Sequence, residues 1–217
     1  MFFLMLIFLC SINAQEYNMN KVLKNTINEV ISMPDKIPSE RKARLSHLAN
    51  YIQNNDKINL LFVCTHNSRR SQMSEIWAKI AADYNGIGEN ILTYSGGTEA
   101  TAFNPRAVKA METLGVKFKI NGSENPKYIY SSNGIDYTCF SKKYDDEFNP
   151  KENFCAVMTC SDADANCPYI PGANDRISIT YNDPKEYDGT EKEDEKYIER
   201  SKQIASELFY VMSKVKK

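Results

Sequence analysis

The sequence predicts an α/β fold in which a four-stranded, mostly parallel sheet carries helices on both faces, with an inserted β-hairpin and an N-terminal helical extension. Three observations lead to this prediction. Apolar runs of strand length alternate with segments of helical periodicity, an Asn-Gly pair divides two β-rich segments, and two further helical segments precede the first strand. Sheets of this kind use right-handed crossovers and bind ligands at the carboxyl ends of their strands.

Residues 1–14 have the features of a removable leader. The run MFFLMLIFLCSINA is apolar, ends in a small residue and is followed directly by polar residues, a pattern that resembles a secretory signal peptide. It is too short to be a permanent membrane-spanning helix. We therefore expect a periplasmic or secreted protein with no stable membrane span, or a cytoplasmic protein if translation begins at Met19.

Residues 15–57 are expected to form a helical extension ahead of the main domain. Apolar residues recur at helical spacing over residues 20–32 and again over residues 39–53, and prolines between these two segments separate the helices. The apolar side of each helix should pack on the main domain or serve as an interaction face.

The main, catalytic domain is expected over residues 58–217. The apolar run at residues 58–63 should be a strand buried on both faces, and a polar segment after it leads into a helix whose apolar residues recur over residues 73–84. Asn104-Pro105 should open the next helix. The other expected elements are strands at residues 91–95, 154–159 and 176–181, a turn at Gly96-Gly97, a hairpin over residues 127–141, an exposed charged loop at residues 142–153, a polar loop at residues 160–171 and a last helix with a capping box at Thr190 and Glu193.

The six cysteines fall into different settings. One lies in the leader, and the odd number that remains argues against a fully paired disulfide scaffold. Cys139 and Cys155 lie in apolar, strand-like runs, so we interpret them as core residues. Cys64, Cys160 and Cys167 lie in loops or directly after strands, where they require a chemical explanation.

The overall charge excludes some classes of partner. The 27 Lys and Arg residues are balanced by 28 Asp and Glu residues, so no overall field attracts nucleic acid or an anionic membrane. A preference for anions must therefore come from a local site.

The strongest functional signal is the segment CTHNSRRS at residues 64–71, between a buried strand and a helix. A tight loop there turns main-chain N–H groups inward, and the helix N-terminus adds its positive end, so both an oxyanion and a Cys64 thiolate nucleophile are favoured. Arg70 can bracket two oxyanion oxygens, and Ser71 can donate to the sulfur. The residues expected to line the oxyanion site between them are Thr65, His66, Asn67, Ser68 and Arg69.

Two features of this loop bear on its function. His66 is expected to contribute its main-chain N–H and to turn its ring outward, without a catalytic role. The whole motif could also be a buried cysteine with arginines that face the solvent. The strand, loop and helix context favours the functional interpretation.

The loop resembles the phosphate loop of the low-molecular-weight tyrosine phosphatases and of the thioredoxin-coupled arsenate reductases. The resemblance covers about residues 58–215 and continues through Tyr94-Ser95-Gly96-Gly97, Asn104-Pro105 and Asp183-Pro184. It implies a small oxyanion, arsenate or phosphate, or a phosphotyrosine as the substrate.

The resemblance also implies roles for individual residues. Cys64 would be the nucleophile, Arg70 the oxyanion clamp and Asp183 the general acid, while Asn67 would organise the loop and Ser71 would donate to the thiolate. Asp183 follows a strand end, so its carboxyl group could reach a leaving oxygen. An ordinary turn Asp before proline would have the same sequence.

A second pair of cysteines favours the reductases. The segment VMTCSDADANCP, which contains Cys160 and Cys167, resembles the redox segment of the arsenate reductases, which simple phosphatases usually lack. The resemblance implies that Cys64 attacks arsenate and that Cys160 attacks the adduct and releases arsenite. An external thiol reductant such as thioredoxin would then reduce a Cys160–Cys167 disulfide. No cofactor or metal is implied, since zinc would need further Cys or His ligands nearby.

The phosphatase alternative keeps the same nucleophile and acid. Cys64, Arg70 and Asp183 would hydrolyse phosphotyrosine through a cysteinyl-phosphate intermediate, and the cysteine pair would be regulatory or structural. Tyr181 and Tyr187 are expected near the mouth of the site.

The cysteine pair and the loop each allow a further role. A static disulfide between Cys160 and Cys167 would suit a secreted protein. His66 and Arg69 stand where the reductases commonly have Gly and Cys, which leaves substrate and partner open. A noncatalytic oxyanion-binding protein is a third possibility, and it would keep its activity after Cys64→Ser.

Overall fold

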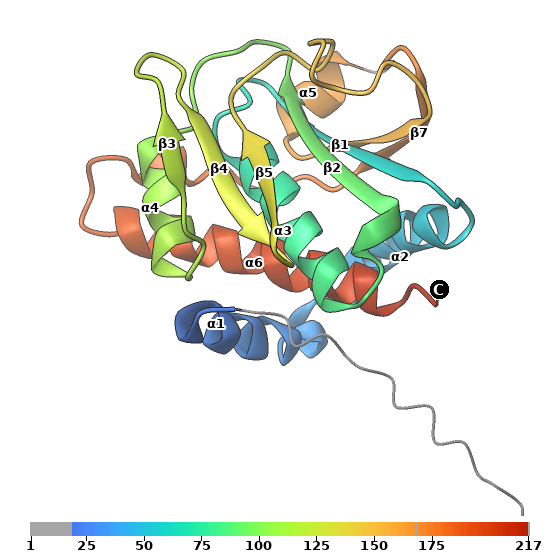
Figure 1. The fold of residues 1–217 in the computed structure, drawn as a ribbon, viewed down its shortest axis with the longest axis horizontal. Coiled ribbons are helices and arrows are strands. Elements are labelled where there is room, and N and C mark those ends of the chain that lie inside the picture. Colours follow the sequence, from blue (N-terminus) through green and yellow to red (C-terminus); the bar gives the residue numbers. More distant parts are fainter. Residues whose placement is uncertain (1–18, 168, 217) are drawn as a thin grey trace, which may run out of the picture.

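The centre of the fold is a four-stranded parallel sheet in the order β2-β1-β6-β7 (Figure 1). The computed structural model describes residues 19–167 and 169–216, so the predicted leader lies outside the described residues. The strands are β1 (Ile58–Cys64), β2 (Ile91–Gly97), β6 (Phe154–Met158) and β7 (Ala173–Ser178). The predicted α/β sheet is confirmed.

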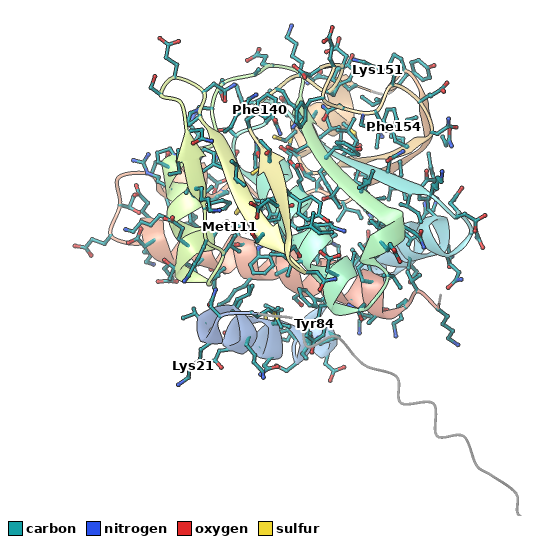
Figure 2. The ribbon with its side chains drawn as sticks, viewed as in Figure 1. Lys21, Tyr84, Met111, Phe140, Lys151 and Phe154 are labelled. Carbon is teal, nitrogen blue, oxygen red and sulfur yellow. The ribbon has the colours of Figure 1, made fainter. Side chains whose placement is uncertain are left out.

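Two apolar cores lie on the two faces of this sheet, because successive strand residues point to opposite faces. Leu60 and Phe62 face the larger core, which the long helices build. Leu61 and Phe154 face the smaller core, which one short helix and loops complete. Figure 2 labels Phe154, the first residue of β6. The helices are α1 (Lys21–Ile31), α2 (Ser39–Gln53), α3 (Arg70–Tyr84), α4 (Pro105–Thr113), α5 (Ser161–Asn166) and α6 (Glu193–Ser213), with short 3-10 turns at Pro34–Lys36, Gly88–Asn90 and Pro184–Tyr187.

The two helices of the extension, α1 and α2, are confirmed and pack against α6 (Figure 1). Asn20 caps α1, since its Oδ1 accepts the Leu23 N–H at 3.0 Å while its Nδ2 donates to the Gly115 carbonyl at 2.7 Å. The inward side chains of both helices, such as Ile27 and Leu48, are fully buried in the larger core. The extension and the main domain therefore share one core.

The predicted hairpin is confirmed as part of a second, antiparallel sheet in the order β3-β4-β5. Its strands are β3 (Lys119–Asn121), β4 (Lys127–Ser132) and β5 (Ile135–Cys139). Asn133 and Gly134 have φ values of 49° and 77°, as a two-residue hairpin turn with positive φ requires. Strand β3 was not expected, because its three residues are too few to show a strand pattern in the sequence.

The predicted turn at Gly96-Gly97 is wrong, since both residues belong to β2. Gly97 pairs with Cys64 of β1, and an added Cβ there would lie 2.6 Å from the Thr65 carbonyl oxygen and 2.7 Å from the Asn67 nitrogen. At Gly96 a Cβ would collide with the main chain of Tyr144. These glycines therefore permit a close approach of three main-chain segments.

We expect Gly97→Ala to lower the free energy of unfolding by about 1–3 kcal/mol, since main-chain atoms of the 64–71 loop must move to admit the methyl group. Chemical denaturation followed by circular dichroism measures this change. Leu92→Ala, at an exposed position of the same strand, is the control and should cost much less. A Gly97→Ala protein as stable as the wild type would contradict the close packing.

Three expected elements differ in detail from the structure. The polar loop at residues 160–171 contains α5, a six-residue helix that buries only Ala163 and so has no apolar periodicity. The last strand of the main sheet lies at 173–178, three residues earlier than expected. The charged loop at 142–153 is not wholly exposed, since Lys142 and Asn149 are buried. A charged residue in a loop gives no sequence signal of burial.

The expected capping box at the start of α6 does not form. The helix begins at Glu193, one residue after its N-cap Lys192, so Thr190 lies too early to cap it. Thr190 Oγ1 donates instead to the Tyr187 carbonyl at 2.7 Å, and the Glu193 carboxylate accepts the Gly189 N–H at 2.6 Å. Both side chains therefore stabilise the turn before α6.

Candidate active site

The predicted loop lies between β1 and α3, with Cys64 as the last residue of the strand and Arg70 as the first of the helix. The Cys64 Sγ lies 3.0 Å from Ser71 Oγ, which accepts a hydrogen bond from Asn67 Nδ2 at 2.8 Å. Because a hydroxyl has one proton to give, Ser71 is free to donate that proton to the sulfur. This geometry agrees with the expected contact between Ser71 and Cys64.

The buried side chain of Asn67 holds the loop in place through hydrogen bonds. Asn67 is fully buried and has a φ of 46°, in the left-handed region where Asn is tolerated better than most residues. Its Oδ1 accepts the Lys142 N–H at 2.8 Å and a bond from Gln72 Nε2 at 3.3 Å. An organising role was expected for Asn67, but nothing in the sequence indicates that Lys142 and Gln72 are its partners.

The main-chain carbonyls of the loop point away from its centre. Those of Cys64, Thr65 and Ser68 accept N–H groups of residues 98–104 at 3.2, 2.8 and 2.8 Å, and the His66 carbonyl accepts the hydroxyls of two neighbouring segments. In a trans peptide unit the N–H points opposite to the carbonyl. The N–H groups that follow these carbonyls therefore face the inner side of the loop, as an oxyanion cup requires.

Arg70 contacts groups at the mouth of this cup. Its Nη1 donates to the Tyr181 carbonyl at 2.8 Å and its Nη2 to Asp183 Oδ2 at 2.7 Å. Its Nε is buried and has no hydrogen-bond partner within residues 19–167 and 169–216. A buried donor without a partner is unfavourable, so an anion bound in the cup is a candidate partner for the Nε–H of Arg70.

The side chain of Arg69 hydrogen-bonds to Asp183. Its Nε donates to Asp183 Oδ1 at 2.9 Å and its Nη2 to Oδ2 at 3.3 Å. The structure joins Arg69, Arg70 and Asp183 in one ion-paired cluster, and the expected oxyanion-binding role of Arg69 stays a prediction. The cavity above Cys64, lined by His66, Ser68 and this cluster, has a volume of only about 10 Å³.

The two arginines lower the pKa of Asp183. Burial alone would raise the pKa of this carboxyl group, but the guanidinium groups of Arg70 and Arg69 outweigh it and lower the pKa below its ordinary value. Asp183 is therefore a carboxylate at neutral pH in this arrangement, and it competes with any bound anion for the fork of Arg70.

The cysteine pair lies beside the cup. Cys160 is fully buried, accepts the Ala163 N–H at 3.3 Å as the N-cap of α5, and has its Sγ 3.5 Å from Thr65 Oγ1. Cys167 follows the last residue of α5 and is partly exposed. Cys64, Cys160 and Cys167 gather around the same small core. All five cysteines of the described residues carry free thiols.

The other two of these five cysteines have a different environment. Cys139 and Cys155 are fully buried within strands, and burial raises the pKa of both thiols. A thiol that resists ionisation is a poor nucleophile. The interpretation of these residues as core residues is confirmed by their burial.

Two further expectations about the mouth can be compared with the structure. His66 turns its ring outward, where the half-exposed side chain lies 3.5 Å from Glu99, as expected. Tyr181 lies near the mouth through its carbonyl, but its side chain is buried, and burial raises the pKa of its hydroxyl. Its ring faces α2 because Arg41 lies over it, so only its main chain contributes to the mouth. Tyr187 is half-buried beneath Lys196.

Neither a metal centre nor a membrane span is found in the described part of the chain. No three His, Cys, Asp or Glu side chains gather there in a way that could hold a metal ion. No helix among those residues is both long and apolar enough to cross a bilayer.

Comparison with known proteins places this site in a family. Residues 59–131 match the profile of the low molecular weight phosphotyrosine protein phosphatases. Arsenate reductase 2 of Staphylococcus epidermidis is 33% identical over 129 residues, which cover 59% of this chain and 80% of the relative. The chain belongs to this family of phosphatases and related arsenate reductases.

Two further known proteins are similar to this chain in sequence or in structure. Arsenate reductase of Staphylococcus aureus strain Newman is 33% identical over 130 residues, covering 59% of this chain and 79% of its own. The crystal structure of a low molecular weight phosphotyrosine phosphatase from Vibrio cholerae superposes with a TM-score of 0.48 and 17% identity. That superposition covers 70% of this chain and 92% of the other.

Proposed function

We propose that this protein reduces arsenate to arsenite, with Cys64 as the nucleophile and Cys160 and Cys167 as the redox pair. One observation carries the proposal. A second free thiol, that of Cys160, lies beside Thr65 at the rim of the cup, and a third, that of Cys167, lies at the far end of the adjoining helix. Hydrolysis of a phosphate ester has no use for these two thiols, whereas a two-electron reduction needs them.

The first step is attack of the Cys64 thiolate on arsenic(V). An S–As bond forms and an As–O bond breaks, and the oxygen leaves as water after receiving a proton. Inward N–H groups and the free Nε of Arg70 stabilise the oxyanion. Asp183 lies at the mouth and is the candidate donor of that proton once the bound oxyanion has replaced it at the fork of Arg70 and it has become protonated.

The second step transfers two electrons to arsenic. The Cys160 thiolate attacks the Cys64 sulfur, an S–S bond forms, and the S–As electron pair remains on arsenic, which leaves as arsenite. Cys167 then attacks Cys160, which frees Cys64 and leaves a Cys160–Cys167 disulfide. An external dithiol protein of the thioredoxin kind would reduce this disulfide and complete the cycle.

The test compares two substrates. The chain beginning at residue 15 is assayed for arsenite formation from arsenate with a thioredoxin system, and for hydrolysis of an aryl phosphate. We expect arsenite formation that depends on the reductant and continues over many turnovers. Rapid aryl phosphate turnover without any arsenite would overturn the reductase proposal.

A phosphotyrosine phosphatase is the second candidate, and the place of Asp183 at the mouth of the cup favours it. An aryl ester leaves as a phenoxide that needs a proton, and Asp183 could supply one after a bound oxyanion replaces it at the fork of Arg70 and it takes up a proton. On this proposal a cysteinyl-phosphate forms at Cys64 and water hydrolyses it, while the cysteine pair takes no part.

Arg69→Gln provides a pH test of Asp183 as the acid. The substitution removes one of two cations that lower the pKa of Asp183, so this pKa should rise and the protonated form should persist to higher pH. The alkaline limb of kcat for phenyl phosphate, a substrate with a poor leaving group, should therefore move to higher pH. An unchanged limb would exclude Asp183 as the group that titrates. Arg106→Gln, on the surface near α6, is the control.

A further inference from the structure

The N-terminal extension is connected to the active site through the buried side chain of Arg41. Arg41 of α2 donates from Nε and Nη2 to Glu207 Oε2 of α6, at 3.0 and 2.7 Å. Its guanidinium carbon also lies 4.7 Å from the centre of the Tyr181 ring. Arg41 is 15% exposed and Glu207 is 4% exposed, so the charged pair is largely removed from solvent.

Tyr181 connects this contact to the catalytic loop. Its side chain is buried under Arg41, while its main chain is fixed on both sides of the residue. The Tyr181 N–H donates to the Thr159 carbonyl at 3.0 Å, and the Tyr181 carbonyl accepts Arg70 Nη1 at 2.8 Å. Asp183, which holds the other Nη of Arg70, follows only two residues later.

We propose that α2 is part of the catalytic apparatus and that Arg41 is a positioning residue. By holding the Tyr181 ring, Arg41 fixes the carbonyl that orients the Arg70 guanidinium above Cys64. When an oxyanion takes Nη2 from Asp183, the bond from Nη1 to the Tyr181 carbonyl becomes the main remaining anchor of the Arg70 guanidinium. This inference rests on the proposed oxyanion chemistry and assigns a role to a segment that precedes the family match at residue 59.

Packing alone does not explain Arg41. The apolar side of α2 already attaches the helix through Leu45, Leu48 and Ile52, which are fully buried. A buried ion pair is often no more stabilising than an apolar pair of similar volume, because both charges lose their hydration. The directional contacts of Arg41 with Glu207 and with the Tyr181 ring therefore point to orientation of the strand end.

The test replaces Arg41 with Met, which keeps the length and apolar stem but removes the fork. We expect kcat/KM for aryl phosphate and for arsenate to fall roughly tenfold, since a small displacement of Arg70 weakens its hold on the transition state. Arg41→Lys keeps a cation over the ring and should restore part of the loss. Arg44→Met, at a half-exposed position of the same helix paired with Glu40, is the matched control and should behave as the wild type.

A second measurement separates this inference from the proposed function. Inorganic phosphate should protect Cys64 from alkylation by iodoacetamide, and Arg41→Met should need roughly tenfold more phosphate for the same protection. This readout requires oxyanion binding but no turnover, so it applies even if the wild type reduces no arsenate. A folded Arg41→Met protein with wild-type protection and kinetics would overturn the role of Arg41. Glu207→Gln, which keeps Arg41 but weakens its anchor, gives the same test if Arg41→Met does not fold, and wild-type protection in that variant would also overturn it.

Discussion

Cys64→Ser is expected to abolish both arsenate reduction and aryl phosphate hydrolysis, with a loss of at least about a thousandfold in kcat, because both reactions begin at this sulfur. The substituted hydroxyl can keep the contact with Ser71, which lies 3.0 Å from the Cys64 sulfur, so the fold should remain intact. Steady-state kinetics and circular dichroism measure the two properties.

The noncatalytic alternative predicts a different outcome for Cys64→Ser. A protein that only binds oxyanions would keep its biological activity after this change. Cys155→Ala is the matched control, since Cys155 is also buried in the central sheet and burial raises the pKa of its thiol. It should retain turnover, and a comparable loss of turnover there would indicate damage to the fold.

Substitutions of Cys160 and of Cys167 should have large and different effects on the release of arsenite. Reduced enzyme, freed of excess reductant and given arsenate, should release one arsenite per chain in the wild type and in Cys167→Ser. Cys160→Ser should release none, because no thiol then attacks the Cys64 adduct. Cys167→Ser should also accumulate a Cys64–Cys160 disulfide, which peptide mass spectrometry detects.

Aryl phosphate hydrolysis gives the control for both variants. Its rate should stay within about threefold of the wild type, a change of well under 1 kcal/mol in the barrier, because the hydrolytic steps use neither cysteine. Continued arsenite release by Cys160→Ser would exclude the proposed sequence of thiol attacks. A parallel loss of hydrolysis would mean that Cys160 holds the cup together by packing.

Local patterns predicted much of the fold and of the cup. The buried strand β1, the helices of the extension and the Asn133-Gly134 hairpin each follow from periodicity or turn chemistry within a short segment. The cup could also be predicted, because its nucleophile, its guanidinium and its serine lie within residues 64–71. These features depend on neighbours in the sequence, so the sequence alone carries them.

Contacts between distant segments could not be predicted in the same way. Arg69 and Asp183 are separated by 114 residues, and nothing in either segment shows that two arginines share one carboxylate. Gly97 was mistaken for a turn residue, because a glycine needed for close approach looks the same in a sequence as one needed for a bend. Nothing in the sequence around Arg41 indicates that this residue contacts Tyr181.

The short helix α5 imposes a geometric condition on the redox cycle. Cys160 and Cys167 lie at its two ends, and a rise of 1.5 Å per residue places their Cα atoms roughly 10 Å apart, whereas a disulfide requires less than about 7 Å. Closing that bond must therefore unwind α5 and release the Asp164 and Cys167 carbonyls from Arg176, which now holds them at 2.6 and 3.0 Å. The oxidised chain would thus present a different surface from the reduced one, and a reductant could recognise its substrate by shape before any sulfur is exchanged.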